Sequence, residues 1–166
     1  MKKVFFLGLI SLMLWSCSFE TPTQFSEAAA NEQVFSLANE ALTLKEVLGQ
    51  YKGKKVLIDV WASWCSDCIR GLPNVAKLQR EFPEVVFLFL SVDTHREAWK
   101  KGIQRFQIDG EHYNLPKGMS DGDFVDFVGL SWIPRYLLID EEGGIALFKA
   151  TSASDKRIPQ ALRKIQ

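Results

Sequence analysis

The chain has 166 residues, of which 47% are hydrophobic and 24% are charged, and this suits one compact domain with a normal core. Twenty basic and twenty acidic side chains give a formal net charge of zero. No basic stripe stands out, so we expect no nucleic acid partner and look for function in a local site rather than in a charged surface.

Residues 1–16 have the pattern of an export signal. Two lysines precede the apolar run VFFLGLISLML at residues 4–14, which is too short to span a bilayer comfortably. The stretch LWSC at residues 14–17 resembles the lipobox of bacterial lipoproteins, in which the cysteine, here Cys17, is lipidated after cleavage. An ordinary secretory peptide that ends in a cysteine is the alternative. We therefore predict a lipoprotein signal peptide and a protein of the cell envelope, anchored to a bacterial membrane and facing the periplasm.

Residues 17–33 are predicted to be the lipidated cysteine and a flexible tether, because this stretch is rich in Ser, Thr, Ala and acids without a sustained period. The folded domain is then expected to span residues 34–166. Whether the anchor lies in an inner or an outer membrane stays open.

Hydrophobic periodicity predicts short strands and helices along this domain. In chain order we expect a hairpin with strands at 35–37 and 41–44, a helix at 44–51, a strand at 56–60, a helix at 66–82 and a strand at 85–92. A third helix follows, which Asp93 or Thr94 caps and which buries Trp99, Ile103 and Phe106. The remaining elements are a short strand at 111–115, a short helix containing Phe124, Phe127 and Val128, a hairpin with strands at 136–140 and 145–148, and a last helix that buries Ile158, Ala161, Leu162 and Ile165.

The runs VLIDV at 56–60 and VVFLFLSV at 85–92 are nearly continuous in apolar residues, which is typical of strands covered on both faces. A helix of suitable length joins them, so they are expected to form a parallel pair in a right-handed βαβ unit. With no internal repeat, the whole pattern indicates a single α/β domain.

Cys65 and Cys68 form a C-x-x-C pair where the first buried strand meets a helix. A zinc site needs four ligands, and His95 and His112 are not at ligand spacing. Haem attachment needs a histidine directly after the second cysteine, where Ile69 stands. A structural disulfide that closes so small a loop would stabilise little. A redox pair is favoured, because a helix N-terminus stabilises the thiolate, the reactive form of cysteine.

A wider set of residues resembles the active-site framework of the thioredoxin fold. They are Asp59, Trp61, Ala62, Trp64, Cys65, Cys68, Pro73 and the Ile133-Pro134 pair. Together with the export signal, the leading hairpin and the long segment before Pro134, they resemble the membrane-anchored TlpA/ResA type over about residues 34–166. The resemblance implies a central mixed β-sheet flanked by helices, an N-terminal β-hairpin and an insertion before the strand that follows a cis proline.

The expected mechanism divides the roles among three residues. Cys65 attacks a partner's disulfide, Cys68 resolves the mixed disulfide, and Asp59 exchanges a proton with Cys68 as acid or base, because burial would raise its pKa towards neutrality. An Asp satisfied by backbone or lysine partners is the alternative for Asp59. In the TlpA/ResA type an acid often stands three residues after the second cysteine, where this chain has Gly71.

The resemblance further implies a cis Ile133-Pro134 peptide that faces Cys65 and pairs with an extended substrate strand. Trp64 is expected beside the cysteines and Trp132 on an apolar rim for the partner, with simple packing as the alternative for Trp132. Trp61 is expected in the core, and His95 and His112 on the surface.

This chain departs from the family pattern at three positions. Asp67 replaces the usual proline before the second cysteine, Trp132 replaces a small residue, and Arg135 replaces a threonine. A carboxylate two residues from Cys65 disfavours its thiolate and raises the thiol pKa, which predicts a reducing rather than an oxidising protein.

We therefore expect an extracytoplasmic thiol-disulfide oxidoreductase that reduces protein disulfides and needs no metal and no cofactor beyond its own dithiol. The resemblance implies a membrane thiol carrier as electron donor. The expected substrates are disulfide-containing proteins, and the sequence leaves open whether these are apocytochrome c, another oxidoreductase or a general pool of misoxidised proteins. The protein is expected to be a monomer. Two alternatives remain: a binding lipoprotein without turnover, and a peroxiredoxin-like peroxidase, although a Thr in the position that such a peroxidase needs is missing upstream of Cys65.

Overall fold

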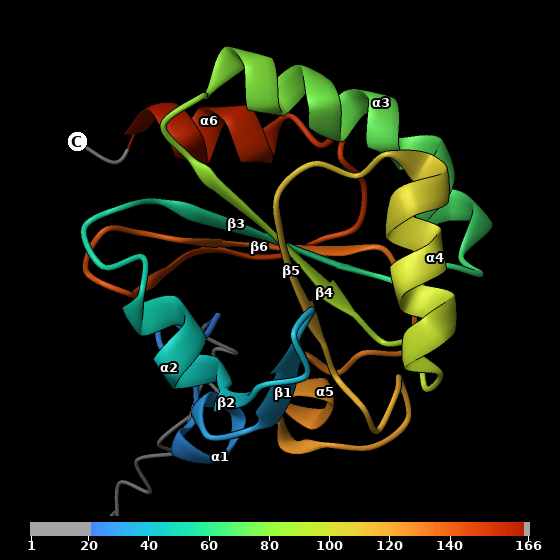
Figure 1. The fold of residues 1–166 in the computed structure, drawn as a ribbon. Coiled ribbons are helices and arrows are strands. Elements are labelled where there is room, and N and C mark those ends of the chain that lie inside the picture. Colours follow the sequence, from blue (N-terminus) through green and yellow to red (C-terminus); the bar gives the residue numbers. More distant parts are fainter. Residues whose placement is uncertain (1–20, 165–166) are drawn as a thin grey trace, which may run out of the picture.

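The computed structural model describes residues 21–164, and its central feature is a seven-stranded mixed β-sheet (Figure 1). In chain order the strands are β1 (Gln33–Ser36), β2 (Ala41–Thr43), β3 (Val56–Trp61), β4 (Val86–Ser91), β5 (Glu111–Asn114), β6 (Arg135–Ile139) and β7 (Ile145–Ala150). Across the sheet they follow the order β2-β1-β5-β4-β3-β6-β7. The two buried strands that the sequence predicts, β3 and β4, therefore lie near the middle.

Helices cover both faces of this sheet. They are α1 (Glu27–Ala30), α2 (Leu44–Gly49), α3 (Ser66–Glu81), α4 (Arg96–Phe106), α5 (Asp123–Val128) and α6 (Arg157–Lys164). Figure 1 shows α3, α4 and α6 on one side of the sheet and α1, α2 and α5 on the other. The mixed sheet, the N-terminal hairpin and the insertion, which holds α4, β5 and α5, are as the sequence predicts.

The centre of the sheet brings β3 against β4 on one side and against β6 on the other. The pairing with β4 is parallel, as expected, and that with β6 is antiparallel. All six residues of β3 are buried. In this register Asp59 lies opposite Phe89 of β4 and opposite Tyr136 of β6. Residues paired in this way share a face of the sheet, so these three side chains form one row.

The position of β5 corrects the prediction that His112 lies on the surface. This strand is inserted between β1 and β4, where it pairs parallel with β4. His112 is consequently buried, with its ring stacked on Phe89 at 5.4 Å between centroids and its Nε2 atom 3.0 Å from the carbonyl oxygen of Ile108. His95 is exposed, as predicted.

The N-terminal segment also differs from the prediction, because the described part of the expected tether is packed against the domain. Ser26 caps α1, and the ring of Phe25 lies 5.4 Å from that of Phe127 in α5. The carbonyl oxygen of Thr23 accepts a hydrogen bond of 2.8 Å from the Ile145 amide. Apolar burial outweighs the polar composition of this stretch, so the folded unit begins before residue 34.

Glu32 follows α1, and its carboxylate connects the N-terminal segment to the start of α5. Its side chain is 3% exposed, accepts hydrogen bonds from the amides of Asp123 and Phe124, and lies 3.2 Å from Lys117 Nζ.

Within residues 21–164 no helix has the length and apolarity needed to cross a bilayer. The predicted signal peptide and Cys17 lie outside the described residues.

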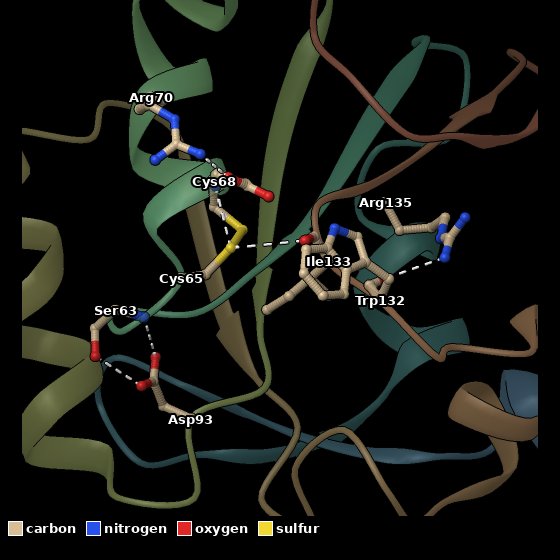
Figure 2. The surroundings of a disulfide bond; sticks show 9 residues. Ser63, Cys65, Cys68, Arg70, Asp93, Trp132, Ile133 and Arg135 are labelled. Atoms are coloured by element: carbon tan, nitrogen blue, oxygen red, sulfur yellow. Dashed lines mark hydrogen bonds and ion pairs between the residues drawn. A yellow bond between two sulfur atoms is a disulfide. The ribbon is translucent and has the colours of Figure 1, made fainter.

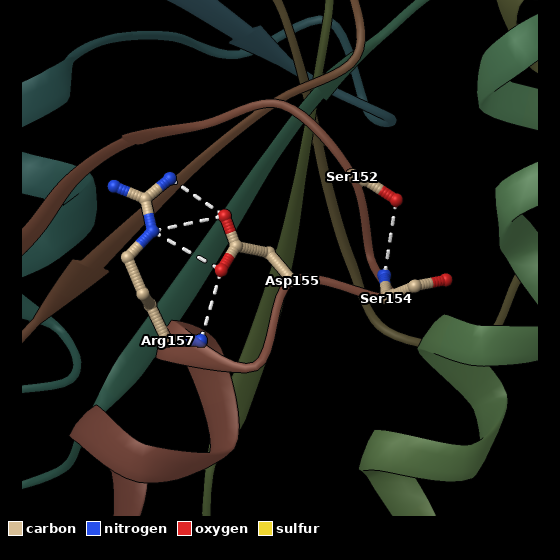
Figure 3. Close-up of polar contacts among 4 residues, drawn as sticks. All are labelled: Ser152, Ser154, Asp155 and Arg157. Atoms are coloured by element: carbon tan, nitrogen blue, oxygen red, sulfur yellow. Dashed lines mark hydrogen bonds and ion pairs between the residues drawn. The ribbon is translucent and has the colours of Figure 1, made fainter.

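The link from β7 to α6 is held by local polar contacts (Figure 3). The Arg157 guanidinium and amide both donate to the Asp155 carboxylate, with the Nε atom 3.0 Å from Oδ2, and the Ser154 amide donates to Ser152 Oγ at 3.1 Å. The hydrogen bonds from Arg157 hold the pKa of Asp155 below its usual value. These contacts start α6 so that Ile158 and Leu162 are buried against the sheet.

Candidate active site

Cys65 and Cys68 lie at the carboxyl end of β3, where the chain turns into α3. They form a disulfide with their Cα atoms 5.3 Å apart (Figure 2). Cys65 is the N-cap residue of α3, and the amide of Cys68 donates to its sulfur at 3.1 Å. After reduction this amide and the positive end of a 16-residue helix would stabilise a Cys65 thiolate. The pair therefore has the position that its predicted chemistry requires.

The loop before Cys65 is held by a buried carboxylate. Asp93 accepts hydrogen bonds from the Ser63 amide at 2.9 Å and the Ser63 hydroxyl at 2.7 Å (Figure 2), and from the Ser91 hydroxyl at 2.8 Å. Asp93 was expected as a helix cap, but α4 begins after His95 without a side-chain cap. The prediction was wrong because Asp93 is turned towards the cysteine loop instead.

Ile133 and Pro134 face this loop across the site. Their peptide bond is cis, as the resemblance implied, and the carbonyl oxygen of Ile133 lies 3.7 Å from Cys65 Sγ. The guanidinium of Arg135 turns back and donates to the carbonyl oxygen of Trp132 at 3.1 Å (Figure 2). The segment before β6 is thus placed directly beside the sulfur predicted to attack.

An apolar cavity of about 180 Å³ opens beside Cys65. Its lining residues are Trp64, Cys65, Ser66, Asp67, Met119, Trp132 and Ile133. Trp64 and Trp132 are 60% and 61% exposed, whereas Trp61 is 1% exposed in the core, as predicted. Such exposure of two large aromatic side chains around a reactive group is typical of a protein-binding surface. Met119 was missed, because the loop that carries it has no recognisable motif.

Asp67 lies on the rim of this cavity and forms an ion pair with Arg70, three residues further along α3. From the sequence, the Asp67 carboxylate is expected to disfavour the Cys65 thiolate. The Arg70 guanidinium has the opposite charge, so Asp67 and Arg70 act on the Cys65 thiolate in opposite directions. The reducing character of the protein therefore remains a prediction.

Asp59 lies on the face of β3 that α3 covers. Its side chain is 4% exposed, and burial raises its pKa to about 8, while the facing Tyr136 hydroxyl opposes this rise. Tyr136 is itself fully buried, and its hydroxyl is 3.5 Å from where a Cβ atom on Gly71 would lie. Gly71 is one helical turn beyond Cys68. Tyr136 was not singled out from the sequence, because only the pairing of β6 with β3 brings it opposite Asp59.

Among residues 21–164, no group of three or more His, Cys, Asp and Glu side chains could hold a metal ion. Larger cavities exist, including one of about 540 Å³ that reaches Val56 and Ile139 at the other end of the central strands. It contains no cysteine. The cysteine pair lies at the opposite end of β3 from this cavity.

A family model described as Thioredoxin-like matches residues 53–145, more than half of the chain and the whole C-x-x-C region. The chain belongs to the thioredoxin-like family. Its relatives include the thioredoxin-like protein YneN of Bacillus subtilis, which is 26% identical over 98% of each chain. The thiol-disulfide oxidoreductase ResA of Halalkalibacterium halodurans is 25% identical over 84% of this chain and 76% of its own.

Solved structures agree on the fold of this thioredoxin-like chain. The thioredoxin domain of a thiol-disulfide oxidoreductase from Bacteroides vulgatus superposes with a TM-score of 0.69, at 23% identity, over 89% of this chain and all of that one. A thiol-disulfide oxidoreductase from Bacteroides fragilis gives a TM-score of 0.66 at 19% identity, over 81% of this chain and 98% of its own. Thiol-disulfide oxidoreductases thus recur among the relatives of this thioredoxin-like protein.

Proposed function

We propose that this thioredoxin-like protein is an extracytoplasmic thiol-disulfide oxidoreductase that reduces disulfides in other proteins. The single observation that supports this most is the placement of the Cys65–Cys68 disulfide. It lies at a helix N-terminus, beside the carbonyl oxygen of Ile133 and next to an apolar cavity rimmed by exposed tryptophans. The relatives named thiol-disulfide oxidoreductases support the same chemistry.

In the proposed reaction the reduced protein supplies two electrons. The Cys65 thiolate attacks one sulfur of a partner's disulfide, so that a mixed disulfide forms and the partner's other sulfur leaves as a thiolate. Cys68 then loses its proton and attacks Cys65, which restores the Cys65–Cys68 disulfide and releases the partner as a dithiol. Asp59 is the proposed acceptor of the Cys68 proton. A membrane thiol carrier would reduce the disulfide again.

The place of this reaction is also part of the proposal. The sequence pattern at residues 1–17 supports export and lipidation at Cys17, which would hold the protein at a bacterial membrane facing the periplasm. Disulfide-containing proteins of that compartment, apocytochrome c among them, are the proposed substrates.

Reduction of insulin disulfides with a dithiol donor tests the proposed activity. The wild-type protein is expected to accelerate insulin precipitation, and Cys65→Ser is expected to abolish the acceleration because it removes the attacking thiolate. The Leu37→Ala variant, at an exposed position outside this cavity, is the control. Absence of cysteine-dependent turnover with every thiol donor would favour a binding protein without catalysis.

Trp132→Ala is expected to raise KM for a protein disulfide about tenfold, because a large exposed aromatic beside Cys65 is lost from the docking surface. The rate with a small disulfide such as oxidised glutathione is expected to stay unchanged. Leu37→Ala provides the matched control, since Leu37 is 44% exposed and does not line the cavity beside Cys65. Equal KM values for wild type and Trp132→Ala would remove Trp132 from the partner surface.

A further inference from the structure

Tyr136 occupies an unusual position between the sheet and the active-site helix. It is the β6 partner of Asp59 in the register, and both side chains are turned towards α3. The tyrosine is 0% exposed and the aspartate 4% exposed. Among the described residues, neither the Tyr136 hydroxyl nor the Asp59 Oδ1 atom has a partner within hydrogen-bonding geometry. A buried polar group without a partner costs free energy, and each of these two groups faces the other as an available partner.

The helix above them has a matching gap. Gly71 has no side chain, and the Tyr136 hydroxyl lies 3.5 Å from where its Cβ atom would be. Gly71 follows Cys68 by three residues, which places the two on neighbouring positions of one helix face. The hydroxyl therefore reaches the underside of α3 close to the resolving cysteine while it also faces Asp59.

The other neighbours of Asp59 leave Tyr136 as its polar contact within the sheet. On the β4 side the row continues with Phe89, and the nearest titratable group beyond that ring is His112 of β5, which stacks on the far side of Phe89. From α3 the facing titratable groups are Cys68 and, at the helix start, Cys65. On the β7 side Tyr136 pairs with Ala150, which carries no polar atom in its side chain.

We propose that Tyr136 is a positioning residue whose hydroxyl donates a hydrogen bond to the Asp59 carboxylate and holds it beneath Cys68, ready to accept the Cys68 proton. This inference rests on the proposed function. In the resolving step the S–H proton of Cys68 passes to the carboxylate, and the Cys68 sulfur bonds to Cys65 as the bond from Cys65 to the partner breaks. The partner's sulfur leaves with the electron pair and is protonated by solvent.

Tyr136→Phe tests this role, because it keeps the ring and removes only the hydroxyl. The hydroxyl favours the ionised carboxyl, so its loss is expected to move the midpoint of the Asp59 titration upward by about one pH unit. That midpoint is measured from the carboxyl ¹³C resonance of the reduced protein. The resolving rate at pH 7 is expected to fall about tenfold, because fewer molecules then hold an ionised Asp59.

Two further measurements separate positioning from general damage. The rate of mixed-disulfide formation in the Cys68→Ser background is expected to be unchanged by Tyr136→Phe, since that step needs only Cys65. Tyr113→Phe is the control, because the Tyr113 hydroxyl faces Tyr51 instead of Asp59. It is expected to leave both the midpoint and the resolving rate unchanged.

The wild-type protein gives an independent test. This test requires neither a correctly folded variant nor catalytic turnover. If the hydroxyl bonds to the carboxylate, the ring Cζ resonance of Tyr136 is expected to change with the same midpoint as the Asp59 carboxyl. A flat Tyr136 resonance, or an Asp59 midpoint that Tyr136→Phe does not move, would overturn the inference. Absence of cysteine-dependent turnover in the wild type would overturn the proposed function while these titrations still decide the contact.

Discussion

Cys68→Ser is expected to stop the reaction after its first step and to leave partner proteins bonded to Cys65. Serine cannot attack the mixed disulfide, so the bond between Cys65 and the partner persists. The adducts are measured on non-reducing gels of envelope extracts, and the attached proteins are identified by mass spectrometry after release with a reductant. Their identities would show which disulfide-containing proteins the cavity beside Cys65 accepts.

The control for trapping is the double variant Cys65→Ser/Cys68→Ser, which is expected to form no adduct because it has no attacking thiolate. Adducts of equal amount in both variants would mean that another cysteine carries the partners. Persistent adducts with wild type, at the level of Cys68→Ser, would contradict the assignment of Cys68 as the resolving cysteine.

Asp59→Asn is expected to slow the resolving step about a hundredfold, because an amide cannot accept the Cys68 proton. Burial raises the pKa of Asp59 to about 8, so the wild-type rate is expected to rise with pH and to level off above about pH 8. In the variant the rate is expected to follow the ionisation of the thiol alone. Stopped-flow tryptophan fluorescence measures this step, and Asp126→Asn, at an exposed site on α5, is the control.

The same substitution is expected to stabilise the fold. A carboxyl whose pKa is raised on folding binds more protons in the native than in the unfolded state, so wild-type stability falls as pH rises from about 4 to about 8. Asp59→Asn removes this loss. Its midpoint of urea denaturation is expected to exceed that of wild type by a margin that widens with pH. A constant margin would mean that Asp59 does not ionise at a raised pKa.

Strands with strong apolar runs were predictable, because burial on both faces leaves a pattern that few alternatives share. The sequence therefore placed β3, β4 and the hairpin of β6 and β7 correctly, and with them Cys65 at the start of α3. The cis bond before Pro134 came from family resemblance, since periodicity carries no information about peptide isomers.

The parts that failed depend on contacts between distant segments. Asp93 looked like a cap because it precedes a helix, yet its carboxylate is satisfied by Ser63, thirty residues earlier. Tyr136 resembled any apolar position of a strand until the register placed it opposite Asp59. Polar composition suggested that the stretch containing Phe25 was a tether, although its few apolar side chains find partners on α5.

The packed N-terminal segment would limit the distance between the disulfide and a lipid anchor at Cys17, if the proposed lipidation takes place. If Cys17 carries the anchor as proposed, only the residues between it and Thr23 remain to bridge the gap, about 20 Å when fully extended. The Thr23 carbonyl oxygen accepts a hydrogen bond from the Ile145 amide. Ile145 pairs with Ile139 of β6, and Ile139 pairs with Val56. Val56 lies at the end of β3 opposite the cysteines, so Thr23 is near that end of the domain. The domain would therefore stand close to the bilayer with its disulfide turned outward, accessible to proteins of the aqueous compartment more readily than to those buried in the membrane.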